Sequence, residues 1–394
     1  MSSATPAGAT VVVTPPARTD GPLSIGQLAG PYLAADIAAR SARVRGERVV
    51  TTAGVDVHQD SVRARAEAEG VEAEKLAATL RDEFVDTLDA ARIRYDVFLD
   101  PLSAEYQRGV TTLAANLTEA GRIPLRKRTM LACADCDARA AAGRCARCGG
   151  QPRSLHVAVP VLSIEDYRQE LTEIWLRATL PDRARQALTH HLERRLPDVP
   201  IAYPANWGLE GIGPHEGLRI DPYAEIGLST VYGVAQTLRP GSVGLEEIAE
   251  AWSEADSLWH FNDFNVCFYF TLLWPALYLA CGISPETLAG AYVTTPYPQT
   301  DPICATEFLH NENIDIARLY LAWTHPAPIS WPTYRAFESH VDPQLEGTSP
   351  LLAEVDLHQA RTALDPQTLN PPTATRALLT NPHATHLREI LTGR

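Results

Sequence analysis

Residues 10–30 read TVVVTPPARTDGPLSIGQLAG. The run of valines is typical of a buried strand, and the prolines and the glycine that follow it predict a loop. Apolar residues then recur at helical spacing over residues 25–45, and the β-branched residues at 49–52 predict a second strand. A strand, a loop, a helix and a strand in this order favour an α/β fold with a Rossmann-like, doubly wound parallel sheet.

Farther along the chain, four cysteines form two Cys-x-x-Cys pairs, Cys133/Cys136 and Cys145/Cys148, separated by eight residues. Each pair can place two thiolates on one metal ion, and four thiolates close a tetrahedral shell. The spacing therefore predicts a structural zinc knuckle, with a knuckle that has lost its metal or holds a different one as the alternative.

Basic residues gather around this knuckle, although the chain as a whole is acidic. The patch predicts contact with RNA or with a phosphorylated partner, and the alternative is an ordinary solvated surface. Its members are Arg122, Arg126, Lys127, Arg128, Arg139, Arg144, Arg147 and Arg153.

The overall composition is that of a soluble chain with room for two or three domains. It has 394 residues, of which 45% are hydrophobic, and a formal net charge of −14. The odd, clustered cysteines and the absence of a recognisable signal peptide favour a reducing, cytoplasmic location. The apolar stretch at 266–283 contains Pro275 and lacks flanking basic residues, so we expect a buried helix and no membrane contact.

Several motifs occur in the order found in methionyl-tRNA synthetase, a class I aminoacyl-tRNA synthetase, which the sequence resembles over most of its length. They are GPLSIGQLAG at 21–30, AGVDVHQ at 53–59, the cysteine knuckle, HF at 260–261 with LLWPA at 272–276, and IDIARLY at 314–320. The resemblance implies a catalytic domain split by a connective insertion. We expect a disordered tail at 1–9, the two catalytic halves at 10–118 and 201–325, the zinc-bearing insertion at 119–200, and a short helical, proline-rich C-terminal segment at 326–394.

The resemblance also implies where ATP and Mg²⁺ would act. The family's His-Ile-Gly-His loop corresponds here to Ser24-Ile-Gly-Gln27, which keeps hydrogen-bond donors but no imidazole, and Gly26 keeps the close backbone approach that a nucleotide needs. The family's lysine-rich second signature falls near residues 294–306, where this sequence has no lysine, and no Lys or Arg occurs between Arg239 and Arg318. Each lost donor costs about 10²–10³ in rate, so the stabilisation of the ATP phosphates is expected to be weaker than in the family.

The resemblance also indicates which residues would form the amino-acid pocket. Asp56 aligns with the family residue that holds the substrate's α-amino group, and Asn265 with a ribose contact. Asp221 and Glu225 replace apolar pocket residues, so a polar or cationic amine-bearing ligand is expected in place of methionine; alternatively, one or both acids point to solvent. His58 aligns with a family histidine and either lines the site or is structural.

Three functions fit these expectations. The favoured one is an enzyme of specialised, natural-product metabolism that activates an amino acid and ligates it to a small amine, a hydroxylamine or a carrier, together with a partner enzyme of the same pathway. The alternatives are an enzyme on the same scaffold that does not use ATP, and an inactive pseudosynthetase that binds a ligand or a partner. The last seventy or so residues are too few and too proline-rich to form the family's anticodon module, so tRNA is expected to bind through the basic patch or not at all.

Overall fold

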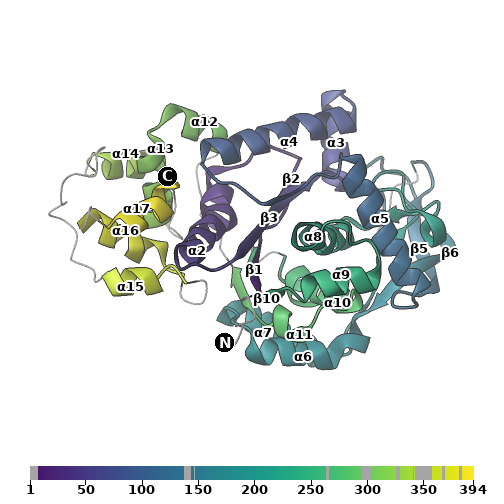
Figure 1. Ribbon diagram of the computed structural model, residues 1–394. Coiled ribbons are helices and arrows are strands. Elements are labelled where there is room, and N and C mark those ends of the chain that lie inside the picture. The colour runs from purple at the N-terminus through teal and green to yellow at the C-terminus, as the bar shows by residue number, and fades with distance from the viewer. Residues whose placement is uncertain are drawn as a thin grey trace, which may run out of the picture.

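The computed structural model describes residues 8–136, 143–145, 147–262, 266–294, 303–324, 329–339, 341, 357–365, 369–380 and 384–394. Its centre is a parallel sheet in the order β11-β10-β1-β3-β2, with β4 also paired to β3 (Figure 1). The strands are β1 (Ala9–Val13), β2 (Ala17–Arg18), β3 (Val49–Asp56), β4 (Val97–Leu99), β10 (Ala255–Asn262) and β11 (Ala291–Thr294). Because β1 lies between the two halves, the strand order reverses beside it, as predicted for a doubly wound sheet.

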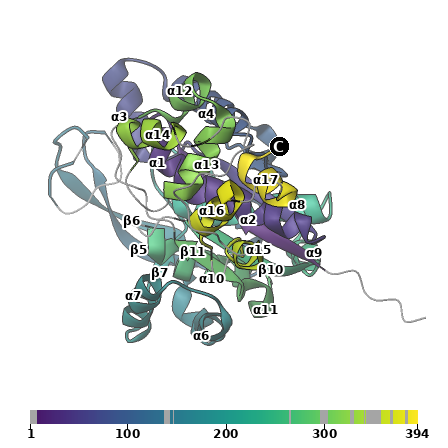
Figure 2. The ribbon, with the colours of Figure 1, turned by 90° about the vertical axis from the view of Figure 1, so that its left-hand side faces the viewer.

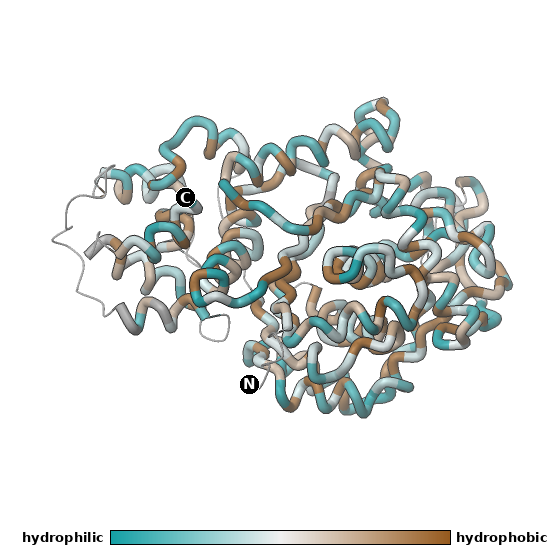
Figure 3. Tube along the Cα trace, in the orientation of Figure 1, coloured by the Kyte–Doolittle hydropathy of each residue, from teal (hydrophilic) through white to brown (hydrophobic). Residues whose placement is uncertain are grey.

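Both faces of the sheet are covered, which explains the unbroken run of valines in β1. Val11 and Val13 belong to one hydrophobic cluster with α8 (Pro222–Leu238) and α10 (Trp274–Ala280), whereas Val12 packs against α2 (Leu33–Val44). Successive side chains of a strand point to opposite faces, so a strand buried on both faces is apolar at every position. β1 begins at Ala9, the last residue of the predicted tail, because its backbone N–H donates to Glu254 O. Figure 3 shows apolar segments along these central strands.

The first helix differs from the prediction of one continuous helix over 25–45. The structure has a short α1 (Ile25–Gln27), a π-turn (Leu28–Tyr32) and then α2. Gly30 departs from helical geometry immediately before Pro31, which has no N–H to donate and whose ring disfavours a helical conformation in the residue before it. The signature loop and α1 therefore form a unit separate from α2.

The remaining helices of the catalytic body flank the sheet. They are α3 (Asp60–Glu69), α4 (Ala73–Ala90), α5 (Ala104–Glu119), α9 (Leu245–Trp252), α11 (Pro285–Leu288) and α12 (Ala305–Asn311). The stretch at 266–283 forms a π-turn (Tyr269–Leu273) and α10, whose residues are all buried, as predicted. None of the helices in the described ranges combines the length and the apolar character needed to cross a bilayer.

The insertion projects from this body as an antiparallel hairpin with the cysteines at its tip (Figure 2). Its hairpin strands are β5 (Leu125–Cys133) and β6 (Pro152–Ser163), and β7 (Asp198–Pro200) pairs with the base of β6. Two helices, α6 (Arg168–Arg177) and α7 (Asp182–Leu192), follow β6. A small ribbon of β8 (Ala202–Tyr203) and β9 (Arg219–Ile220) then leads the chain back to α8.

The C-terminal helices pack beside α2 on one side of the molecule (Figure 1). They are α13 (Ile314–Thr324), α14 (Trp331–Glu338), α15 (Leu357–Thr362), α16 (Pro371–Thr380) and α17 (Thr385–Thr392). Arg318 of α13 is 1% exposed and donates hydrogen bonds to Asp36 of α2 and to the carbonyls of Ala91 and Leu391. This one side chain therefore ties the last helix to the catalytic body.

Candidate functional site

The candidate site lies where the parallel strands end, at the carboxyl edge of the sheet. Asp56 is the last residue of β3 and is 6% exposed. Gln59 Nε2 donates to Asp56 Oδ2 at 2.8 Å, and the backbone carbonyl of Asp56 accepts hydrogen bonds from the N–H and the hydroxyl of Thr19. The carboxylate thus has a fixed position at the point where α/β proteins of this topology bind ligands.

Two residues beyond β3, His58 forms a buried ion pair with Glu225 in the first turn of α8. His58 Nδ1 lies 2.9 Å from both carboxylate oxygens, and the hydroxyl of Tyr106 donates to Glu225 Oε1 at 3.0 Å. Glu225 is 3% exposed. It therefore faces the interior, so the alternative that this acid points to solvent is wrong.

The charges around His58 favour its protonated form. Burial by itself lowers the pKa of His58, but the charge and the hydrogen bond of Glu225, together with the charge of Asp56, outweigh burial and raise the pKa above its usual value of 6.5. The Glu225 charge also contributes, after burial, to a pKa of Tyr106 well above its usual value of 10. Tyr106 therefore stays a hydrogen-bond donor to this carboxylate.

Asp221 is the N-cap residue of α8. Its Oδ1 accepts hydrogen bonds from the backbone N–H groups of Tyr223 and Ala224 at 3.0 and 3.1 Å. A carboxylate at this position also complements the positive end of the helix dipole. The same side chain lines the cavity described next, so its charge faces that cavity as well.

A cavity of about 260 Å³ lies beside the ion pair, between the catalytic body and the returning end of the insertion. Aromatic rings form much of its wall: Tyr223 and Tyr269 stack with ring centroids 3.7 Å apart, and Trp207 meets His58 edge-on with centroids 6.0 Å apart. The other lining residues are Gln59, Asp60, Val199, Pro200, Tyr203, Ala205, Asp221, Pro222, Phe268 and Leu273.

In the signature loop, Ser24 and Gln27 bond to each other's backbone. Ser24 Oγ accepts from the Gln27 N–H at 3.2 Å, and Gln27 Oε1 accepts from the Ser24 N–H at 2.9 Å, which is a capping box. The Ser24 hydroxyl hydrogen and the Gln27 amide hydrogens are not used in these bonds. The loop therefore holds two donors in fixed positions next to the buried Gly26.

The last residues of the expected second signature pair with this loop. The N–H of Ile25 donates to Ile303 O and the N–H of Ala305 donates to Leu23 O. A cation from another element also reaches the loop: Arg65 of α3 donates to Asp20 O at 2.7 Å. Residues 295–302, which include most of the expected second signature, and the predicted ribose contact Asn265 lie outside the described residues.

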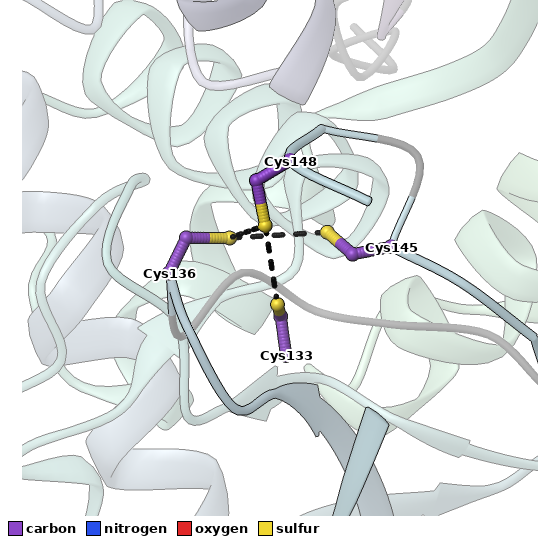
Figure 4. Close-up of side chains that lie close together, drawn as sticks. All are labelled: Cys133, Cys136, Cys145 and Cys148. Carbon is purple, nitrogen blue, oxygen red and sulfur yellow. Dashed lines mark hydrogen bonds between the residues drawn. The ribbon is translucent and has the colours of Figure 1, made fainter. Parts of the chain in front are cut away.

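The four cysteines converge at the tip of the hairpin (Figure 4). Their Sγ atoms all lie within 4.8 Å of one another, with Cys133–Cys148 and Cys136–Cys148 at 3.4 Å and Cys136–Cys145 at 3.8 Å. Zinc–sulfur bonds of about 2.3 Å at tetrahedral angles require sulfur–sulfur separations of about 3.8 Å. The cluster therefore fits a structural zinc ion.

Acidic side chains neutralise part of the basic patch around the knuckle. Arg147 pairs with Glu67 of α3, and Arg126 and Arg128 both pair with Asp198 of β7. The Arg147 pair joins the insertion to the catalytic body, and the other two lie within the insertion. All three leave less positive charge for a phosphate backbone than the sequence alone indicates.

Three residues at the site were not predicted from the sequence: Tyr106, Trp207 as a neighbour of His58, and Arg65. Tyr106 lies on α5, at a distance of 119 residues along the chain from the acid that it contacts. Arg65 looks like any charged residue on an exposed helix. Tyr106 and Arg65 have no local sequence signal, because only the packing of separate elements brings them to the site.

Comparisons with known proteins agree with this geometry. Residues 10–153 match the family of class I tRNA synthetases (M). A methionine–tRNA ligase of Methanocaldococcus jannaschii is 22% identical over 80% of this chain and 54% of that protein, and one of Methanopyrus kandleri is 24% identical over 83% and 56%. The chain thus spans about half the length of these relatives.

Solved structures show the same fold. Mycobacterium tuberculosis methionyl-tRNA synthetase in complex with methionyl-adenylate superposes with a TM-score of 0.72 at 17% identity, over 95% of this chain and 82% of that one. A second structure of that enzyme bound by methionyl-adenylate gives a TM-score of 0.75 at 16% identity, over 96% and 83%. The present chain therefore has the fold of a methionyl-tRNA synthetase, resembles the class I tRNA synthetases (M) over residues 10–153, and carries a cysteine cluster that fits zinc.

Proposed function

We propose that this chain activates the carboxylate of an amino acid with ATP and transfers the acyl group to a small-molecule amine, hydroxylamine or carrier instead of to tRNA. The observation that carries the proposal is the rebuilt pocket, in which Asp56 keeps its place beside a buried His58–Glu225 ion pair. This combination suits an amino-acid substrate but not the substrate of an ordinary methionyl-tRNA synthetase.

Recognition of an amino acid begins at Asp56. An ionised carboxylate that is buried and held in place binds an ammonium group through strong, charge-assisted hydrogen bonds. Gln59 and Thr19 already fix the position of Asp56, so a substrate's α-amino group would find it in place. The fixed donors of Ser24 and Gln27 lie on the loop that faces the α-phosphate in the family, and Arg65, which also pairs with Glu69, donates to the preceding Asp20 carbonyl.

The pocket is unsuited to methionine. A thioether offers little hydrogen bonding, and it would displace water from around the charged His58–Glu225 pair without replacing the bonds that the water made. A substrate with polar groups compensates for that loss. The proposed substrate is therefore a polar amino acid.

A small acceptor agrees better with the charges than tRNA does. The chain carries a formal net charge of −14, and Arg126, Arg128 and Arg147 of the basic patch are engaged with acids. Binding of a polyanion depends on free cationic side chains that release counterions. Such an activity is characteristic of specialised metabolism, in which a partner enzyme supplies or modifies the acceptor.

The test is ATP–pyrophosphate exchange by the zinc-loaded chain with each amino acid in turn. We expect one polar amino acid to support exchange. The Asp56→Asn variant should lose about 10²-fold or more in kcat/KM for that amino acid, because the ammonium loses its charged partner. An exposed substitution, Asp82→Asn, serves as the matched control and should leave exchange unchanged. If the folded wild-type protein supports no exchange with any amino acid, the proposal is wrong.

A further inference from the structure

The cavity beside the ion pair has the composition of a site for an amine. Asp60 and Asp221 contribute negative charge, and Tyr203, Trp207, Tyr223, Phe268 and Tyr269 contribute aromatic faces and edges. Aromatic faces attract cations, and carboxylates do so more strongly. No lysine or arginine is among the described residues that line the cavity.

This cavity is adjacent to the proposed amino-acid site, because the two share a wall. Gln59 lines the cavity and its amide donates to the Asp56 carboxylate. His58 lines the cavity as well, and the charge of Asp56 acts on its imidazole. A molecule in the cavity would therefore lie next to the amino acid held at Asp56.

The ion pair engages one ring nitrogen of His58, a residue that lines this cavity. His58 Nδ1 must donate its hydrogen to Glu225, because an ionised carboxylate can only accept. Within the described part of the chain, His58 Nε2 has no hydrogen-bond partner. Tyr106 holds the carboxylate and Trp207 contacts the ring, so the direction of Nε2 is fixed. A carboxylate that orients an imidazole in this way makes its second nitrogen a general base.

We propose that the cavity is the acceptor site, that it takes a small molecule bearing a primary ammonium or hydroxylamine group, and that His58, oriented by Glu225, removes the proton from the attacking nitrogen. This inference rests on the proposed function for the activated acyl group.

With an amine acceptor, the transfer begins with deprotonation of the bound ammonium. His58 Nε2 takes a proton from the bound ammonium and releases it to solvent. The neutral nitrogen then attacks the carbonyl carbon of the aminoacyl adenylate; a C–N bond forms, the C–O bond to the phosphate breaks, and AMP leaves with the electron pair. The remaining excess proton on the nitrogen passes to the same Nε2. Glu225 stabilises the imidazolium each time it forms.

The charges around His58 set the pH dependence of this step. Glu225 on α8 and Asp56 on β3 raise the pKa of His58, burial and Arg219 on β9 lower it, and Asp60 and Asp221 face the same cavity. A base acts in its unprotonated form, so transfer should increase as pH rises through a His58 pKa above 6.5. In a Glu225→Gln variant the charge is lost and burial remains, so the inflection should move to lower pH.

The experiment follows two steps in the same preparations: ATP–pyrophosphate exchange for activation, and acyl transfer to putrescine or to hydroxylamine. We expect His58→Gln to lower the ratio of transfer to exchange by about 10²–10⁴-fold with putrescine, which is the usual contribution of a general base. Hydroxylamine is largely unprotonated near neutral pH, so its ratio should fall less. The surface variant His190→Gln is the matched control and should leave both rates unchanged.

The outcomes separate this inference from the function on which it rests. Exchange by the wild type with no transfer to either amine overturns the inference and leaves activation intact. An equal fall of both rates in His58→Gln, or an unmoved pH profile in Glu225→Gln, also overturns it, because His58 would then act in substrate binding or folding alone. Absence of exchange in the wild type overturns the proposed function itself.

Discussion

Replacing Arg318 with methionine tests whether one buried cation holds the C-terminal helices to the catalytic body. Arg318 donates to Asp36 Oδ2 at 2.5 Å, to Ala91 O at 2.6 Å and to Leu391 O at 2.9 Å, and it is 1% exposed. Removing one partner of a buried ion pair typically costs about 3–5 kcal/mol, because the remaining charge stays buried. Asp36 keeps a hydrogen bond from Arg40 Nε at 2.9 Å, which places the expected loss near the lower end, at about 3 kcal/mol.

The loss can be measured by urea unfolding, monitored by tryptophan fluorescence and by limited proteolysis of the last helix. Arg177→Met is the matched control, because both side chains of its ion pair with Glu286 are exposed, at 56% and 67%. Exposed pairs contribute about 0–1 kcal/mol, so this control should unfold almost like the wild type. Equal stability losses in the two variants would refute the reasoning, since burial would then not distinguish them. An unchanged cleavage rate at α17 would refute the role of Arg318 in holding that helix.

Three further predictions concern the knuckle, the α8 cap and a buried histidine. Cys136→Ser should lose stoichiometric zinc, measured by atomic absorption, whereas Cys304→Ser outside the cluster should retain it. Asp221→Ala should lower the free energy of unfolding by about 0.5–2 kcal/mol through loss of the cap, and Asp221→Ser should restore most of it. Burial lowers the pKa of His215 in the folded protein to about 4, whereas an unfolded histidine has a pKa of about 6.5. As pH falls below 6.5, the unfolded chain therefore binds a proton before the folded protein does, and the free energy of unfolding decreases by up to about 1.4 kcal/mol per pH unit. His215→Gln should flatten this slope in unfolding experiments between pH 6.5 and 5. An unchanged slope would contradict the lowered pKa of His215.

Much of the fold was predictable because its signals are local. The valines of β1, the apolar stretch at 266–283 and the cysteine spacing each reflect the chemistry of adjacent residues, and the structure confirms all three. The break at Pro31 was missed, although proline in a helix interior is a known disruption. The docking of α13 and α17 was not readable, because Arg318 reaches partners 73 and 227 residues away in the sequence.

The candidate site likewise combines a feature that adjacent residues predict with contacts that only the fold creates. The capping box of Ser24 and Gln27 is a local pattern, since a serine followed three residues later by a glutamine is a recognised helix start. The pairing of His58 with Glu225 spans 167 residues, and the support from Tyr106 spans 119. Alignment with a family could place His58 and Glu225 separately, but not the bond between them.

That bond indicates how the pocket was rebuilt. A carboxylate alone in the apolar pocket expected from the family would be costly, because a buried charge without a partner loses its hydration. Glu225 is buried here and accepts one hydrogen bond that His58 Nδ1 shares between its two oxygens and another from Tyr106, so its charge is compensated. The same compensation fixes the imidazole of His58, which lines the aromatic cavity. Under the proposed function, one substitution would make methionine a poor substrate and also orient a base, so a change in substrate and a change in acceptor would have the same physical origin.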